Sequence, residues 1–287
     1  MRKIATIGFF DGVHKGHRFL FSRLRQEAYK RSLEPLIVTF DHHPRSVLQT
    51  DYVPQLLTLP DERKALLANE AKTVFLSFED VHTLTAAEFI KILHEEYDVD
   101  VLMMGYDHQF GSDRLRHPQD YRRVGAEYEV EIITMGEFID GEWHVSSTEI
   151  RQALENGNIA LANELLGYPY QLSGTVVHGN GIGRQIGFPT ANICPDSNEK
   201  IIPKNGVFVV STILHGIGLT RGILNIGTNP TVGNTNRTIE LHIPGFHGDL
   251  YGQSLVVCFE RFVREEKKFD TLEDLRRQIK DDLAEVP

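Results

Sequence analysis

The sequence predicts an α/β protein in two parts: a domain with a mostly parallel sheet, followed by a small antiparallel β-barrel with a C-terminal helix. The first half alternates apolar strand-like runs with helical segments, the pattern of a parallel sheet covered by helices. The second half has short β-rich runs separated by glycine-rich turns, which is typical of small barrels. A chain of 287 residues also fits about two domains.

The first half is expected to supply five strands with helices between them. Thr85 and Glu88 have the spacing of a capping box at the start of one helix. The expected strands are residues 4–10, 36–40, 74–78, 99–104 and 130–135, and the expected helices lie near 16–31, 61–69 and 86–97. Ligands of such sheets bind at the carboxyl ends of the strands.

The domain boundary is expected where a helical stretch over residues 148–166 ends at Gly167 and Pro169. Glycine and proline just past a helix end mark a stop and a connector. The domains are therefore residues 1–169 and 170–287. The second is expected to hold strands at 172–177, 207–214, 222–226, 238–243 and 254–262, then a helix over 271–285.

Composition excludes several classes of protein. The net charge of −10 argues against a nucleic-acid partner, because that binding needs clustered Lys and Arg. No apolar run approaches the roughly 18 residues that cross a bilayer, so no membrane association is expected. Cys194 and Cys258 are too few for a disulfide framework. They indicate a cytoplasmic protein with both thiols buried.

Residues 8–17, Gly-Phe-Phe-Asp-Gly-Val-His-Lys-Gly-His, are the most informative segment. His14 and His17 stand at the start of an expected helix, share one face, and can both reach one phosphoryl group. The helix N-terminus offers free N–H groups and the positive end of its dipole. Gly12 and Gly16 let the backbone approach a ligand closely. The alternative is that the histidines only cap the strand–helix turn.

Residues 145–151, Val-Ser-Ser-Thr-Glu-Ile-Arg, combine hydroxyl groups at a helix start with Arg151 about one turn on. This arrangement suits the outer phosphates of ATP and the departure of pyrophosphate. Ser146 and Glu149 also have capping-box spacing, so a plain helix cap is the alternative.

Two more candidate segments, residues 105–111 and 39–44, each follow an expected strand. Residues 105–111, which include Asp107, are expected to line a nucleotide pocket. His42 and His43 are adjacent, and neighbouring side chains point apart in an extended chain. An ordinary turn is therefore favoured over a metal site there.

The second half has its own candidate phosphate loop at residues 178–184, His-Gly-Asn-Gly-Ile-Gly-Arg. Such a loop exposes backbone N–H groups to phosphate, although glycine-rich turns are also common in barrels. No Gly-Lys-Ser/Thr follows, so it is not a Walker A loop. Thr190 and Asn192 lie two residues apart on an extended segment. Both therefore face one side and offer neutral oxygens to Mg²⁺.

Glu240 lies between Ile239 and Leu241, so it shares a strand face with Thr238 and His242. A carboxylate on that polar face suits a general base for a hydroxyl nucleophile. The alternative is an ordinary solvent-facing glutamate.

These motifs carry a resemblance to known families. Residues 8–17 resemble the HxGH signature of nucleotidylyltransferases, whose histidines stabilise the transition state as a nucleophile attacks the α-phosphate of ATP. The ordered set of residues 8–17, 146–151, 181–192, 225–231 and Glu240 resembles the prokaryotic bifunctional riboflavin kinase/FMN adenylyltransferase family over nearly the whole chain. Residues 248–252 and 265–269 also resemble its C-terminal module.

The resemblance implies a Rossmann-like nucleotidylyltransferase domain and a riboflavin kinase-like barrel. The barrel would phosphorylate riboflavin with ATP and Mg²⁺, with Glu240 as base and Thr190 and Asn192 on the metal and phosphates. The first domain would join AMP from ATP to FMN, giving FAD and pyrophosphate, with His14 and His17 on the α-phosphate. Further nucleotide- or phosphate-binding residues would be Phe10, Asp11, Gly12, Gly16, Asp107, Ser147, Thr148 and Arg151 in the first domain, and Gly181, Gly183 and Arg184 in the second.

Some positions depart from the family pattern and bear on flavin and adenine contacts. His108 stands where the family often has Phe, Asn229 where Arg is common, and His42 where Pro is common.

A fragment of a class I aminoacyl-tRNA synthetase is an alternative, because these enzymes also use an HxGH-type motif. It is opposed by the size and acidic charge of this chain and by the missing Lys-Met-Ser-Lys-Ser loop. A flavin-binding protein with decayed sites is opposed by the presence of Glu240, Asn192 and His17. A chain with only one active half, and the oligomeric state, stay open.

Overall fold

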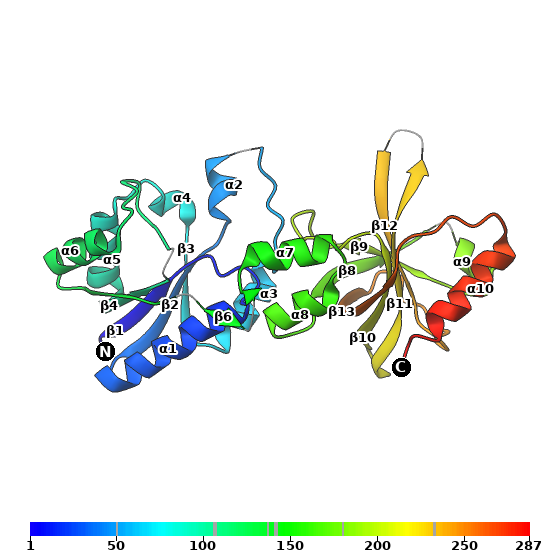
Figure 1. The fold of residues 1–287 in the computed structure, drawn as a ribbon, viewed down its shortest axis with the longest axis horizontal. Helices are drawn as coiled ribbons and strands as arrows, with labels where there is room; N and C mark the ends of the chain where they lie inside the picture. Colours follow the sequence, from blue (N-terminus) through cyan, green and yellow to red (C-terminus); the bar gives the residue numbers. More distant parts are fainter. Residues whose placement is uncertain (50, 106–107, 137, 141–142, 180, 232–233) are drawn as a thin grey trace. The chain divides into compact units, whose positions relative to one another are not determined.

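The computed structural model describes residues 1–49, 51–105, 108–136, 138–140, 143–179, 181–231 and 234–287. By its internal contacts the chain divides into two compact units, residues 1–147 and 148–287 (Figure 1).

Among the described residues of the first unit, five strands form a parallel sheet in the order β3-β2-β1-β4-β5. Their bounds are β1 (Lys3–Ile7), β2 (Glu34–Phe40), β3 (Lys72–Leu76), β4 (Val99–Met104) and β5 (Glu131–Thr134). The predicted parallel sheet is confirmed. The first strand ends earlier than expected, because residues 8–14 already belong to the loop that carries the histidines.

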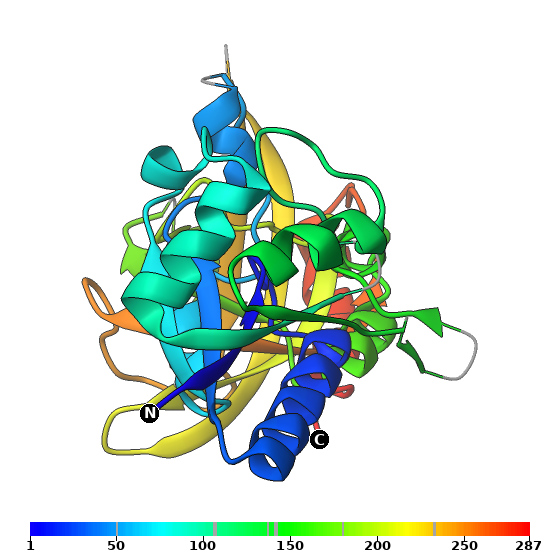
Figure 2. The same ribbon diagram turned by 90° about the vertical axis from the view of Figure 1, so that its left-hand side faces the viewer.

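Helices cover both faces of this sheet, and Figure 2 shows α1 (dark blue) alongside it. Their bounds are α1 (Lys15–Arg31), α2 (Pro44–Leu48), α3 (Pro60–Ala68), α4 (Phe78–Val81), α5 (Ala86–Tyr97) and α6 (Pro118–Glu127), and a hairpin of β6 (Ile139–Asp140) and β7 (Trp143–His144) follows β5. Strand residues alternate between two cores: Ile4 packs with α1 and α3, whereas Ala5 packs with α5 and α6. The predicted capping box of Thr85 and Glu88 opens α5.

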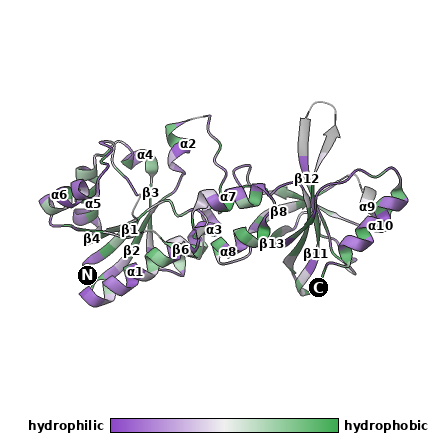
Figure 3. Cartoon of the chain, in the orientation of Figure 1, coloured by the Kyte–Doolittle hydropathy of each residue, from purple (hydrophilic) through white to green (hydrophobic). Residues whose placement is uncertain are grey.

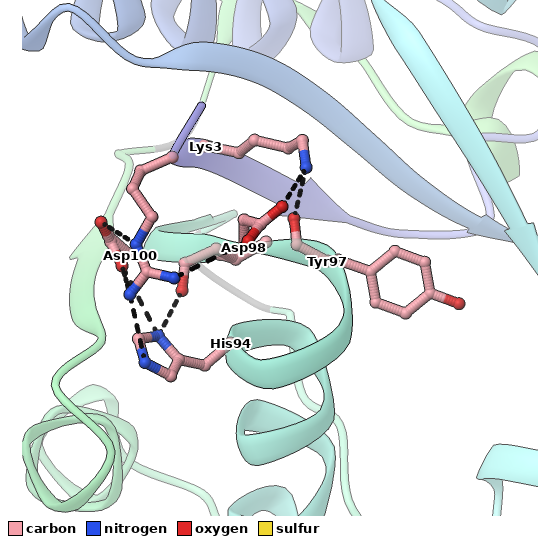
Figure 4. Close-up of polar contacts among 7 residues, drawn as sticks. Lys3, His94, Tyr97, Asp98 and Asp100 are labelled. Carbon is pink, nitrogen blue, oxygen red and sulfur yellow. Dashed lines mark hydrogen bonds and ion pairs between the residues drawn. The ribbon is translucent and has the colours of Figure 1, made fainter.

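The amino end of the sheet is held by polar contacts (Figure 4). Lys3 Nζ donates to Tyr97 O (2.8 Å) and to Asp98 Oδ2 (3.1 Å) where α5 ends. Arg2 Nη2 lies 2.7 Å from Asp100 Oδ1 in β4. These contacts fix β1 against β4 at the end opposite the histidine loop.

The helical stretch expected over residues 148–166 is two helices, α7 (Ser147–Glu155) and α8 (Ile159–Leu166). The prediction of one helix is wrong because Gly157 adopts φ +77° and Asn158 caps the second helix through the N–H of Leu161 (3.2 Å). Helix α8 ends at Gly167, which has φ +78°, as predicted.

In the described part of the second unit, six antiparallel strands close a barrel in the order β10-β11-β12-β9-β8-β13. Their bounds are β8 (Gln171–Val177), β9 (Ala191–Pro195), β10 (Gly206–Leu214), β11 (Gly218–Thr231), β12 (Asn234–His242) and β13 (Ser254–Arg264). The predicted barrel is confirmed, but β9 was not among the expected strands. A short helix, α9 (Ile182–Gln185), lies between β8 and β9.

The C-terminal helix α10 (Leu272–Leu283) is capped by Thr271, whose side chain accepts the N–H of Asp274. It carries hydrophobic and hydrophilic residues on different faces (Figure 3). The terminal helix is thus confirmed.

Helix α8 packs on the barrel, because Asn163 Nδ2 donates to Phe259 O at 2.8 Å and its Oδ1 accepts the N–H of Tyr170 at 2.8 Å. The domain limits at residues 169 and 170 stay a prediction.

In the described part of the chain, no helix combines the length and apolar character needed to cross a membrane. Both cysteines are free thiols, but the prediction that both are buried is wrong, because Cys194 is exposed and Cys258 is half-buried. Ile193, the neighbour of Cys194, is buried, and alternation along β9 puts these two side chains on opposite faces.

Candidate active sites

His14 and His17 lie together at the N-terminus of α1. His14 is the N-cap residue, and its Nδ1 accepts the N–H of His17 at 3.3 Å. The two rings stack with centroids 3.5 Å apart and planes inclined by 19°. The histidines therefore do cap the turn, and the same geometry brings both imidazoles to one helix N-terminus.

His17 is held as a neutral imidazole. Burial, with a smaller contribution from His14, lowers its pKa well below the ordinary 6.5. Its ring also packs edge-on against Phe10, with centroids 5.2 Å apart. Among the described residues, the buried Nδ1 of His17 has no hydrogen-bond partner. A neutral ring at this position can hydrogen-bond a phosphoryl oxygen.

The loop before α1 has an unusual backbone, because Phe10, Gly12 and Val13 all adopt positive φ, of 56°, 80° and 39°. Positive φ is rare for a β-branched residue, and such conformations persist where the surroundings impose them. Phe10 and Val13 are buried in the core beside α1. Packing thus holds the loop in this conformation.

Asp11 ties this loop to residues 57 and 58. Its buried carboxylate accepts the N–H groups of Leu57 and Thr58, each at 3.0 Å, and the Thr58 hydroxyl at 3.2 Å. Thr58 Oγ1 in turn accepts the N–H of Gly12 at 2.9 Å. Asp11, predicted as a nucleotide-binding residue, therefore has a clear positioning role.

The start of α7 lies against the same loop. Ser147 Oγ donates to the carbonyl of Asp11 at 2.9 Å. A β-carbon at Gly16 would lie 3.1 Å from the carbonyl oxygen of Val145, which explains glycine there. Thr148 and Arg151 belong to the second unit, and Asp107 lies outside the described residues.

Sequence reasoning missed Arg63, which is only 1% exposed beneath this loop. Its Nη2 donates to Phe40 O at 2.6 Å and to Asp41 O at 3.3 Å, and its guanidinium lies 3.9 Å from the ring centroid of Phe9. Burial lowers the pKa of Arg63 to about 10, against the opposing effect of nearby carboxylates. Arg63 thus satisfies backbone carbonyl groups at the carboxyl end of β2.

His42 and His43, the adjacent histidines after β2, make different contacts. His43 caps α2 by accepting the N–H of Arg45 at 3.1 Å, whereas His42 lies 3.3 Å from the Asp41 carboxylate. Residues 41–43 thus form a bend that leads into α2.

The second candidate site is a cavity of about 920 Å³ on the barrel. Thr238, Glu240 and His242 all line it, which agrees with the strand face that their alternation predicts they share. Glu240 pairs with Asn192 of β9 on one side and with Asn225 of β11 on the other. Residues directly opposite in neighbouring strands project to one face, so the carboxylate lies between two amides.

Thr190 Oγ1 donates to Glu240 Oε2 at 3.2 Å, which brings the predicted metal-binding and base residues together. Gly181 and Gly183 also line the cavity. A β-carbon at Gly183 would lie 2.4 Å from Phe188 O, so only glycine fits. Arg184 is exposed and is not among the lining residues.

Comparison with known proteins identifies both halves. A FAD synthetase family model matches residues 1–149, and a riboflavin kinase family model matches residues 166–287. A bifunctional riboflavin kinase/FMN adenylyltransferase from Escherichia coli strain K12 is 37% identical over 96% of this chain and 89% of that protein. This chain belongs to the bifunctional riboflavin kinase/FMN adenylyltransferase family.

A second relative and a solved structure also align over nearly the whole chain. A relative with the same name from Listeria monocytogenes is 33% identical over 98% of this chain and 90% of that protein. A crystal structure described as a macrolide-efflux protein from Streptococcus pneumoniae has a TM-score of 0.88 at 32% identity, and covers 99% of this chain and 93% of that one. The fold is thus shared along the chain, and the expected family is confirmed.

Asn225 is the clearest residue of the barrel site that sequence reasoning left out. It falls in an expected strand and in a segment that carries the resemblance, but its pairing with Glu240 depends on the register between β11 and β12. Register is not visible in a single sequence.

Proposed function

We propose that the chain makes FAD from riboflavin in two ATP-dependent steps, at two separate sites. The barrel phosphorylates riboflavin to FMN, and the first unit adenylylates FMN to FAD with release of pyrophosphate. Membership of the family supports both steps. The observation that carries the barrel assignment is the cavity in which Glu240, Thr190 and Asn192 meet.

In the kinase step, the riboflavin 5′-oxygen attacks the γ-phosphorus of ATP. A new O–P bond forms, the bond between the γ-phosphorus and the β,γ-bridging oxygen breaks, and ADP leaves. The Glu240 carboxylate takes the hydroxyl proton as general base. The hydrogen bond from Thr190 keeps that carboxylate oriented in the cavity.

Gly181 and Gly183 line the cavity. Backbone N–H groups of such a glycine loop can bind phosphate. We propose that the loop and Arg184 together hold the phosphates of ATP. The oxygen donors Thr190 and Asn192 fit Mg²⁺, because this ion prefers a few protein oxygens completed by phosphate and water. When bound, Mg²⁺ neutralises charge on the transferred phosphoryl group.

In the adenylyl step, an FMN phosphate oxygen attacks the α-phosphorus of ATP and pyrophosphate leaves. We assign His14 and His17 to the α-phosphate, at the positive end of α1. Gly12 and Gly16 allow the close approach. Phe10, Asp11, Asp107, Ser147, Thr148 and Arg151 complete the proposed nucleotide and phosphate site. Catalysis here rests on positioning and electrostatics.

The partners proposed are therefore riboflavin, FMN, FAD and ATP, in a cytoplasmic setting and without nucleic acid or membrane. The acidic chain agrees with the absence of nucleic acid.

The test is chromatography of flavins after incubation of the purified chain with riboflavin, ATP and Mg²⁺. We expect FMN first and FAD later. FMN without FAD would refute the role of the first unit, and bound but unconverted riboflavin would refute the kinase.

A further inference from the structure

The C-terminal helix α10 forms one wall of the barrel cavity, and Figure 1 shows it (red) beside the barrel. Leu275, Ile279 and Asp282 of α10 line the cavity, together with Val207 and Ile223 from the strands. The cavity lining thus combines apolar side chains from α10 and the strands with the glycine loop and Glu240. Apolar side chains of this kind suit a flat aromatic ring, and the glycine loop suits phosphate.

A buried ion pair fixes this wall to the barrel. Arg264, at the end of β13, donates from Nε to Asp282 Oδ1 at 2.8 Å and from Nη2 to Asp282 Oδ2 at 2.7 Å. The Arg264 side chain is 16% exposed and that of Asp282 is 4% exposed. Gln278 Nε2 adds a third bond to Asp282 Oδ1 at 3.0 Å. Such a two-point pair fixes both distance and direction.

The same helix is attached to the segment that follows the glycine loop. Arg276 Nε donates to the carbonyl of Ile186 at 3.0 Å, and the buried Ile186 side chain also lines the cavity. Two contacts therefore set the position of α10, and the Arg264–Asp282 pair is the more buried of the two.

We infer that the Arg264–Asp282 pair is a positioning device for riboflavin: it sets the spacing between α10 and the barrel, and hence the width of the slot that takes the isoalloxazine ring. The inference rests on the proposed kinase function. Neither side chain is assigned to phosphoryl transfer, since Arg264 and Asp282 hydrogen-bond each other. Loss of the two-point geometry should weaken riboflavin binding and leave the chemical step intact.

The test variant is Arg264→Lys, because lysine keeps the charge but cannot bond both carboxylate oxygens as a planar fork does. We expect the KM for riboflavin to rise by at least about 10-fold, with kcat and the KM for ATP changed by less than about 2-fold. Riboflavin binding without ATP, followed by flavin fluorescence, should weaken by the same factor. The unchanged kcat for riboflavin phosphorylation is the folding control for the barrel, and FAD formation from supplied FMN shows that the first unit is intact.

The matched control is Arg261→Lys, on the same strand. Arg261 also reaches the C-terminal segment, through Glu285 Oε2 at 2.7 Å, but it is 48% exposed and does not line the cavity. We expect wild-type kinetics from this variant. An equal loss of riboflavin affinity would mean that loosening any contact of the C-terminal segment has the same effect, and would overturn the inference.

A second variant, Asp282→Asn, tests the pair from the other side without changing its shape. We expect the same rise in the riboflavin KM, and a double variant no worse than the worse single one, since both changes remove one interaction. Additive effects, or a fall in kcat at constant KM, would contradict the inference. If the wild type neither binds nor converts riboflavin, the proposed function itself fails.

Discussion

At the scale of single residues, Glu240 is the group on which the kinase proposal depends. It lies between Asn192 and Asn225 and accepts a hydrogen bond from Thr190. Glu240→Gln keeps the shape but removes the base. We expect FMN formation to fall by about 10²–10⁴-fold, the usual contribution of general base catalysis.

The check is flavin chromatography with riboflavin and, separately, with FMN as substrate. FAD formation from supplied FMN should be unchanged, because it takes place at the other site. Full kinase activity in the Glu240→Gln protein would contradict the assignment of the base.

His17 gives a prediction on pH. Its pKa is lowered in the folded protein by burial and by His14, whereas in the unfolded chain it stays near 6.5. The unfolded chain therefore binds more protons as the pH falls below 6.5, so stability from this group is complete above that pH and is lost below it.

Denaturant unfolding of wild type and His17→Gln at pH 7.5 and pH 5.5 measures this contribution. We expect the wild type to lose more stability than the variant between the two values. A pH-independent difference between them would show that His17 titrates normally.

Residues that act through distant partners were not predictable. Thr58 and Arg63 look like ordinary surface residues of a helical start in the sequence, yet both are buried. Their partners in the loop and in β2 lie 22 to 47 positions away along the chain. His14 and His17 were predictable because a local motif carries them.

At the scale of elements, the loop of residues 8–14 depends on the hydroxyl of Thr58. Thr58→Val leaves the Gly12 N–H without its acceptor and removes one donor to the Asp11 carboxylate. A buried polar group left unsatisfied costs about 1–3 kcal/mol. We expect a comparable loss of stability and slower FAD formation, with the kinase unaffected.

The measurement combines denaturant unfolding with assays of both steps. Thr58→Ser keeps the hydroxyl and is expected to retain adenylyl transfer. Equal kinase loss in Thr58→Val would point to general unfolding instead of a loosened loop.

The break between α7 and α8 depends on Gly157. A β-carbon there would meet its nearest atoms at 3.4 Å, an ordinary contact, so the cost of Gly157→Ala comes from its φ of +77°. We expect a loss of about 1–2 kcal/mol by denaturant unfolding.

Gly136→Ala is the matched control, because no atom lies within 4 Å of its β-carbon and its φ is not positive. It should change stability by less than about 0.5 kcal/mol. Equal effects of the two substitutions would contradict the conformational explanation.

The element pattern was predictable where apolar residues form runs of several positions, as in β1 to β5 and most of the barrel. It failed at β9, a strand of five residues that contains Asn192 and ends at Pro195. It failed again between α7 and α8, where helical residues flank a turn of only three positions. Short polar elements carry too little periodicity to be recognised.

At the scale of the whole molecule, the two proposed sites lie in two compact units, each with its own packed interior. The FAD synthetase match ends at residue 149 and the riboflavin kinase match begins at residue 166. Each unit contains the residues assigned to one step, apart from Thr148 and Arg151 on α7. The two steps should therefore be separable by single substitutions.

The most direct measurement is a mixing experiment with His17→Ala and Glu240→Gln, each supplied with riboflavin, ATP and Mg²⁺. His17→Ala alone should stop at FMN, and Glu240→Gln alone should leave riboflavin unchanged. An equimolar mixture should form FAD after a lag, because FMN released by one protein is used by the other. FAD from either variant alone at the wild-type rate, or a mixture that stops at FMN, would contradict the account.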